Sequence, residues 1–184
     1  MRSLQAAQSW LPIKEGLVPL QLKSLTIWDS AVIAGLMLDH VQSQFAGGPP
    51  ASVFRSLQNA RYPDMQHAFA IVEDEQAVGF FILKERLALP VWASDGAITI
   101  HNFSIGQQFQ GNGYGRHGLI LATQWCAENR PRANYMELAV NLRNAAAIRL
   151  YMSVGYVDSG RRIEGPLGEL EVLTYPLYRV RTPQ

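Results

Sequence analysis

The chain has almost no excess of charge of either sign, with 16 lysines and arginines against 15 aspartates and glutamates. It also lacks a basic run, which argues against nucleic acid as a partner. A lone cysteine, Cys126, excludes an internal disulfide and a cysteine zinc site. No stretch approaches the roughly 18 consecutive apolar residues of a membrane-spanning helix. We therefore expect no nucleic acid, no membrane and no metal among its partners.

What is present is the composition of a soluble globular protein, 48% hydrophobic and 17% charged over 184 residues. A chain of this length buries a sizeable core without disulfides. We expect residues 1–184 to form a single domain in which residues 1–16 are a poorly ordered N-terminal extension. That extension lacks the continuous apolar core of a signal peptide, which indicates the cytoplasm.

Hydrophobic periodicity divides the chain into strands and helices. Alternating or β-branched segments predict strands at residues 17–22, 67–72, 77–83, 97–105 and 135–140, with two more around residues 165–168. The segments 67–72 and 77–83 form a hairpin around a charged turn. Helical spacing predicts helices at residues 29–45, capped by Asp29, and at 52–61, 116–129 and 144–154.

A glycine-rich loop opens directly onto the third of these helices; it reads Gln110-Gly111-Asn112-Gly113-Tyr114-Gly115. Glycines let a backbone turn tightly and approach a ligand closely. The unpaired amide groups and the positive dipole end of the helix favour negative charge. The loop therefore predicts an anion cradle suited to a pyrophosphate.

The same loop allows a rival interpretation, because Gly113, Gly115 and Gly118 spell G-x-G-x-x-G and Glu137 follows in the next strand. That is the outline of a dinucleotide fingerprint. However, residues 106–112 separate the strand from the first glycine, and residues 1–90 predict helices and a hairpin rather than a βαβ unit. A dinucleotide-binding oxidoreductase is the remote alternative. Glycines that serve only a tight turn and helix packing are another.

A second motif lies downstream, in Val140-Asn141, Asn144, Ala147, Leu150-Tyr151 and Gly155-Tyr156. Together with Gln110, Gly113 and Gly115, it resembles the GNAT superfamily of N-acetyltransferases. The turn at residues 164–169, together with residues 103–115, looks most like the branch that acetylates diamines and polyamines. The resemblance implies an α/β (α+β) fold. Its sheet would be mixed, mostly antiparallel and six- to seven-stranded, with helices on both faces and a splay between strands 4 and 5.

The resemblance also implies acetyl-coenzyme A as acetyl donor, with no metal. The backbone of Phe103, Ser104 and Ile105 would pair with the pantetheine arm. Asn144 would contact that arm or simply cap its helix. Arg116, Arg143 and Arg149 would supply charge for the phosphates or are solvated surface arginines. The pyrophosphate would lie on the loop that comprises Gln110, Gly111, Asn112, Gly113, Tyr114, Gly115 and Arg116.

An N-acetyltransferase must take a proton from the attacking amine and supply a hydrogen to the departing thiolate. By the resemblance Tyr151 donates to the sulfur; otherwise it is a core aromatic residue. Relatives carry a glutamate where this chain has Thr99 or His101. We expect His101 to accept the proton, directly or through a water, or else to be a hydrogen-bonded strand histidine. Strand alternation places Thr99, His101 and Phe103 on one face, and Cys126 is expected in the core.

The resemblance favours a small primary amine as acceptor, either a diamine or polyamine or an amino-acid-like molecule, attacked directly in a ternary complex. Helices between residues 29 and 62 would cover it, and Glu85, Glu164 and Glu169 are candidates to bind a cationic acceptor. A non-catalytic acyl-coenzyme A sensor and a protein N-acetyltransferase are the alternatives. Family analogy alone predicts a homodimer.

Overall fold

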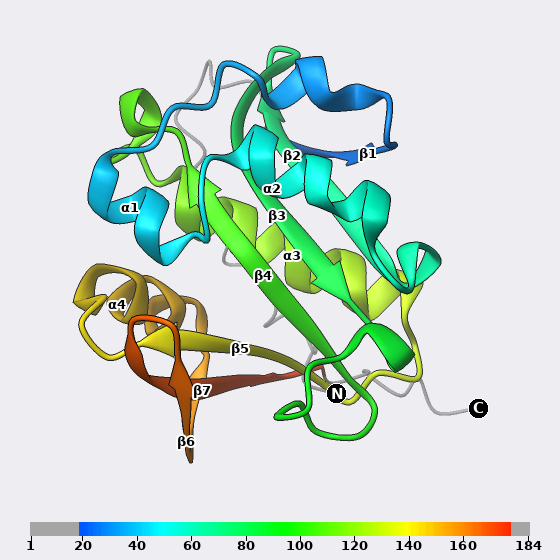
Figure 1. Ribbon diagram of the computed structural model, residues 1–184, viewed down its shortest axis with the longest axis vertical. Coiled ribbons are helices and arrows are strands. Elements are labelled where there is room, and N and C mark those ends of the chain that lie inside the picture. Colours follow the sequence, from blue (N-terminus) through cyan, green and yellow to red (C-terminus); the bar gives the residue numbers. More distant parts are fainter. Residues whose placement is uncertain (1–18, 178–184) are drawn as a thin grey trace, which may run out of the picture.

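The computed structural model describes residues 19–177, whose strands form one seven-stranded sheet in the order β1-β2-β3-β4-β5-β7-β6 (Figure 1). Only β4 and β5 pair in parallel; the other neighbours are antiparallel. The predicted mixed, mostly antiparallel sheet is therefore confirmed. The strands are β1 (Gln21–Leu25), β2 (Gln66–Glu73), β3 (Gln76–Lys84), β4 (Ala97–Ile105), β5 (Tyr135–Asn141), β6 (Val157–Gly165) and β7 (Gly168–Pro176).

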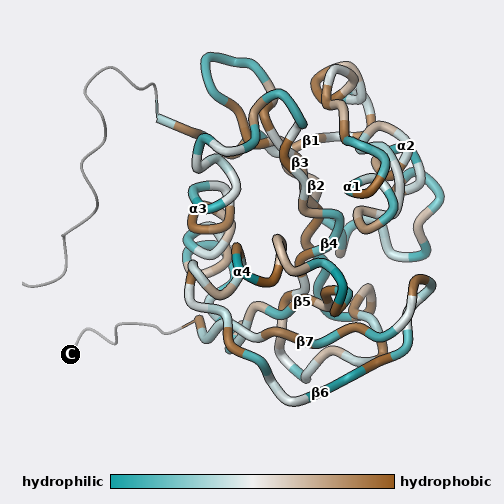
Figure 2. The backbone as a smooth tube through the Cα atoms, turned by 90° about the vertical axis from the view of Figure 1, so that its left-hand side faces the viewer, coloured by the Kyte–Doolittle hydropathy of each residue, from teal (hydrophilic) through white to brown (hydrophobic). Residues whose placement is uncertain are grey.

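Helices cover both faces of the sheet, as Figure 2 shows with α3 and α4 on one side and α1 and α2 on the other. The helix α3 (Tyr114–Asn129) and the helix α4 (Ala145–Val154) share one apolar cluster with β2, β3, β4 and β5. A second cluster joins β2 and β3 to the 3-10 helix η1 (Asp29–Ile33) and to α2 (Pro50–Ser56). Because β2 and β3 are covered on both faces, they read as continuous apolar runs.

The strands β4 and β5 stay paired over a short stretch only, Ala97–Thr99 against Tyr135–Glu137. Beyond it they diverge, and Figure 1 shows α1 (His40–Phe45) and α4 beside the opening. The predicted splay between the fourth and fifth strands is confirmed. It leaves the backbone of one edge of β4 without a neighbouring strand.

A bulge in β4 changes which side chains share a face. The register against β3 shifts between Phe80 and Ile82, and Asn102 on β4 adopts a φ of 54°. An extra residue in one strand turns every later side chain to the opposite face. His101 still shares a face with Thr99, as predicted, but Phe103 packs in the cluster under α3. The prediction that Phe103 shares the face of His101 is therefore wrong.

One predicted helix, residues 29–45, is also wrong, because the chain forms η1, an irregular link and the separate helix α1 there. The Asp29 carboxylate accepts hydrogen bonds from the backbone N–H and the hydroxyl of Thr26 instead of capping a helix. Asp39 caps α1 by accepting an N–H of its first turn at 2.8 Å. A second cap therefore begins a new helix inside the apolar pattern.

The remaining boundaries lie close to the predicted ones. Asp74 and Glu75 link β2 to β3 with φ values of 46° and 63°, as a two-residue hairpin turn requires. The first strand begins later than predicted, after Pro19, which has no N–H to donate to a neighbour. The expected extension at residues 1–16, and the start of the predicted strand at residues 17 and 18, lie outside the described residues. No helix within residues 19–177 has the length and apolar character needed to cross a membrane.

Candidate active site

The opening between β4 and β5 is a cavity of about 1400 Å³. Its walls come from four distant parts of the chain: residues 39–48, the diverging halves of β4 and β5, the glycine loop with the start of α3, and one side of α4. Trp92 and the β6–β7 turn complete it. The sequence-predicted residues that line it are His101, Phe103, Ser104, Ile105, Gln110, Gly111, Gly113, Tyr114, Gly115, Arg116, Arg143, Asn144 and Tyr151.

Backbone conformation explains two glycines of the loop. Gly111 and Gly113 have φ values of 78° and 83°, in the left-handed region that side chains other than glycine rarely adopt. Gly113 is the N-cap of α3, a helix of 16 residues with no acidic side chain in its first turn. The residues of that turn line the cavity, and the first amides of a helix lack partners within the helix and favour an anion.

Close packing explains the next two glycines. A Cβ on Gly115 would lie 3.0 Å from Leu150 of α4, and one on Gly118 would lie 2.4 Å from Ile71 of β2. These contacts seat α3 against α4 and the sheet. Glu137 is 2% exposed and hydrogen-bonded to Ser94 and Arg161, so it is not a free ribose-binding acid. The dinucleotide interpretation therefore loses the acidic part of its fingerprint, and β2 and β3 form an antiparallel hairpin rather than part of a βαβ unit.

Side chains brace the glycine loop from outside and below. Asn112 does not line the cavity; its amide donates to the carbonyl oxygens of Phe109 and Gln110. The Gln110 amide donates to the Gln42 side chain in α1 at 2.6 Å. The Tyr114 hydroxyl donates to Glu73 at the end of β2, which raises the pKa of that phenol. Sequence patterns predicted none of these braces.

The unpaired edge of β4 and the start of α4 form the middle of the cavity. Residues 100–105 of β4 face residues 138–141 of β5 across it. The Asn144 side-chain oxygen accepts the Ala147 N–H at 3.2 Å and so caps α4. Both interpretations of Asn144 are compatible, because its amide group is left to donate into the cavity that it lines.

Tyr151 lies in α4 with its ring between the rings of Phe103 and Tyr156, at centroid distances of 6.3 and 5.8 Å. Burial raises the pKa of its phenol well above the usual value. The hydroxyl is therefore protonated at every physiological pH and can only donate to an anion. Because Tyr151 also lines the cavity, it meets the requirement for a hydrogen-bond donor to a thiolate.

His101 faces the same cavity from β4, and its Nε2 lies 2.7 Å from the Thr99 hydroxyl. Burial, with a smaller effect of the Lys84 charge, lowers the pKa of the imidazole to about 3. The ring is therefore neutral near pH 7. It can accept a hydrogen bond from an amine, but its conjugate acid holds a proton poorly.

Cys126 lies in α3 without exposed surface, and burial raises the pKa of its thiol to about 12. It is a core residue, as predicted. Of the three candidate glutamates, Glu85 is bonded to His67 and Arg130, while Glu164 and Glu169 are exposed on β6 and β7. None of the three lines the cavity.

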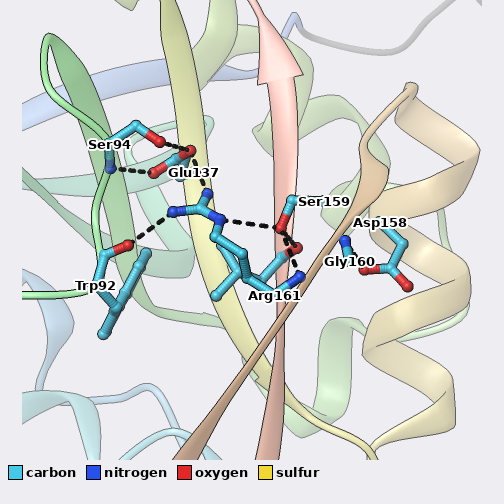
Figure 3. Close-up of polar contacts among 8 residues, drawn as sticks. Trp92, Ser94, Glu137, Asp158, Ser159, Gly160 and Arg161 are labelled. Carbon is cyan, nitrogen blue, oxygen red and sulfur yellow. Dashed lines mark hydrogen bonds and ion pairs between the residues drawn. The ribbon is translucent and has the colours of Figure 1, made fainter.

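An ion-pair network that sequence patterns did not predict holds the backbone of Trp92 (Figure 3), a residue that lines the cavity. The Glu137 carboxylate accepts from the backbone N–H and the hydroxyl of Ser94, each at 2.8 Å, and pairs with Arg161. Arg161 also donates to the Trp92 carbonyl at 2.8 Å. The Trp92 ring then lies 6.2 Å from that of His101. The network therefore ties the loop before β4 to β5 and β6.

Comparison with known proteins identifies this architecture. The model of the family described as Acetyltransferase (GNAT) family matches residues 35–156. The chain belongs to this family. It is accordingly an acetyl-coenzyme A-dependent N-acetyltransferase, as the two sequence motifs predicted.

Known relatives of this GNAT acetyltransferase agree in sequence or in fold. An uncharacterized N-acetyltransferase of Bacillus subtilis (strain 168), YbbJ, is 36% identical over 116 residues, which cover 61% of this chain and 69% of the relative. The aminoglycoside acetyltransferase AAC(6')-Ib in complex with coenzyme A superposes with a TM-score of 0.69 at 16% identity, covering 86% and 95% of the two chains. The spermidine N-acetyltransferase of Vibrio cholerae, in complex with coenzyme A and spermine, superposes with a TM-score of 0.67 at 18% identity and with the same coverage.

Proposed function

We propose that this GNAT acetyltransferase moves the acetyl group of acetyl-coenzyme A to a primary amine of a small molecule, diamine-like or amino-acid-like, by direct attack. One observation carries the proposal: the glycine cradle, the open edge of β4, Tyr151 and His101 all line one cavity. The donor's pyrophosphate would lie on the amides of Gly111–Arg116, and its pantetheine arm along residues 103–105 beside Asn144.

In the proposed reaction the amine nitrogen attacks the thioester carbon, so that a C–N bond forms and the C–S bond breaks. Tyr151 donates a hydrogen bond to the departing sulfur. Since a thiol has a pKa of about 8.5, far below that of Tyr151, the phenol stabilises the thiolate without transferring its proton completely. His101 accepts an amine hydrogen, and the proton passes to water because the imidazole holds it weakly.

Direct attack is supported by the state of Cys126. An acetyl-cysteine intermediate needs an accessible thiolate. Cys126 has no exposed surface and its pKa is raised to about 12, so it supplies none. A small acceptor is supported by residues 39–48 and the β6–β7 turn, which cover the cavity on two sides. The cytoplasmic location and the homodimer stay predictions, and sedimentation equilibrium tests the second.

The decisive experiment follows free thiol release from acetyl-coenzyme A with a panel of small amines, alongside calorimetry with coenzyme A alone. We expect coenzyme binding and acetylation of at least one small amine. Binding without any transfer would favour the acyl-coenzyme A sensor. Transfer confined to peptide substrates would favour a protein N-acetyltransferase. An absence of coenzyme binding would refute the proposal.

The pH dependence of the reaction shows whether the His101 imidazole or water takes up the amine proton. Because His101 is neutral near pH 7, kcat/KM should rise about tenfold per pH unit below the pKa of the acceptor amine, with no inflection between about pH 5 and 8. His101→Gln should lower the rate and keep that slope. An inflection near pH 6.5 that disappears in His101→Gln would show that the imidazole itself is the titrating base.

A further inference from the structure

A second cavity, of about 460 Å³, adjoins the first on the acceptor side of the sheet. Gly47 and Asn102 line both cavities, and the Asn102 amide donates to the Ala46 carbonyl at 2.6 Å. The wall between the two is therefore thin. On its far side the second cavity is lined by Ser52, Val53, Ser56, Leu57, Ala60, Arg61, Gln66, Ile82 and Lys84.

Lys84 ends β3 and points into this second cavity on the same face as His101. Its cross-strand partner is Thr99, whose hydroxyl contacts the His101 ring. Lys84 and His101 are thus diagonal neighbours across β3 and β4, and the side chains of such pairs begin roughly 7 Å apart. The charge of Lys84 contributes to the lowered pKa of His101, in keeping with this proximity.

The Lys84 ammonium is partly buried and has no carboxylate partner among residues 19–177. Burial lowers its pKa, as expected for a cation that has lost water without gaining a counter-charge. Arg61, the other cation of the cavity, is exposed and lies over the Tyr62 ring at 5.2 Å. The cavity therefore offers an anion one half-buried ammonium with three donors.

Acidic side chains are nearly absent from both cavities. Among the described residues that line them, Asp39 is the one acid, and its carboxylate caps α1. The Glu137 carboxylate, on the same face as Thr99, is neutralised by Arg161. A polyamine would thus find no free carboxylate for its further ammonium groups, whereas an anionic group would find Lys84.

We propose that Lys84 forms an anion subsite and that the acceptor is an amino acid. Its amine lies beside His101, and its carboxylate passes Gly47 and Asn102 to reach Lys84. This inference rests on the proposed acetyl transfer. It selects the amino-acid-like acceptor over the diamine, and it gives a role to a lysine that the reaction itself does not use.

The test compares acceptors that share an amine and differ in charge, with thiol release from acetyl-coenzyme A as the assay. Each amino acid is paired with its carboxamide and with a diamine of similar length, in a series from glycine to 5-aminopentanoate. The subsite predicts a kcat/KM about 10 to 100 times higher for the acid than for the amide. Lys84→Met should abolish that preference by lowering kcat/KM for the acid towards the value for the amide.

Lys84→Arg should keep part of the preference, and Lys23→Met, at an exposed lysine of β1, should change nothing. Circular dichroism with calorimetry of coenzyme A checks that each variant is folded and loaded. Equal rates with acid and amide, or a best rate with a diamine, would overturn the subsite and leave acetyl transfer intact. Failure to bind coenzyme A would instead overturn the proposed function itself.

Discussion

Tyr151→Phe should lower kcat by about two orders of magnitude and leave the dissociation constant of acetyl-coenzyme A within twofold of the wild-type value. The substitution removes one hydroxyl from a buried ring and keeps the contacts with Phe103 and Tyr156. That hydroxyl is protonated, since burial raises the pKa of Tyr151 well above its usual value, and it is the donor that we assign to the departing sulfur. Single-turnover thiol release measures the chemical step directly.

Tyr156→Phe is the matched control. The neighbouring Tyr156 is 2% exposed, and its hydroxyl is buried without a hydrogen-bond partner among the described residues. Removing an unsatisfied polar group should keep or increase the free energy of unfolding, and it should not change kcat. If Tyr151→Phe and Tyr156→Phe have the same turnover as the wild type, Tyr151 has no part in the reaction.

Arg161→Met should destabilise the protein by roughly 3 kcal/mol, because it leaves the Glu137 carboxylate buried without its counter-charge. This value is at the lower end of the range for breaking a buried ion pair, since the Arg161 side chain is 37% exposed and water already weakens its attraction to Glu137. Urea unfolding measures the change. Arg149→Met, at an exposed arginine of α4 that forms no ion pair among the described residues, should shift the unfolding midpoint little.

Arg161→Met should also raise the acceptor KM about tenfold, because Arg161 holds the Trp92 carbonyl and so places the indole beside His101. The double variant Glu137→Met with Arg161→Met should recover most of the stability, since no buried charge is left unpaired, while the acceptor KM stays raised. Full recovery of KM in the double variant would contradict the assignment of Arg161 as the residue that positions Trp92.

Much of the fold could be predicted because local rules decide it. β4 was predicted with its observed bounds, Ala97–Ile105, from a β-branched run, and α4 ends at Gly155, which adopts a left-handed φ of 114°. The helix predicted at residues 29–45 failed for a related reason. Apolar spacing there was helical, but the cap at Asp39 begins a new helix, and periodicity alone does not weigh one cap against another.

The conformation of the glycine loop was predictable and the side chains around His101 were not. The glycine loop is a local device, in which left-handed φ values and free helix amides follow from neighbouring residues. The bulge at Asn102, in contrast, has no signal in its own strand, yet it turns Phe103 away from His101. Trp92, Arg161 and Lys84 come from three segments with no shared motif.

The sequence by itself determined the family, the donor and the glycine cradle, since each depends on residues close together along the chain. Only the tertiary structure decided which charges meet: Glu137 with Arg161, and Lys84 with no acid among the described residues. Pairings between distant strands follow from sheet register and burial, which depend on the whole fold. The acceptor therefore has to be inferred from side chains that only folding brings together.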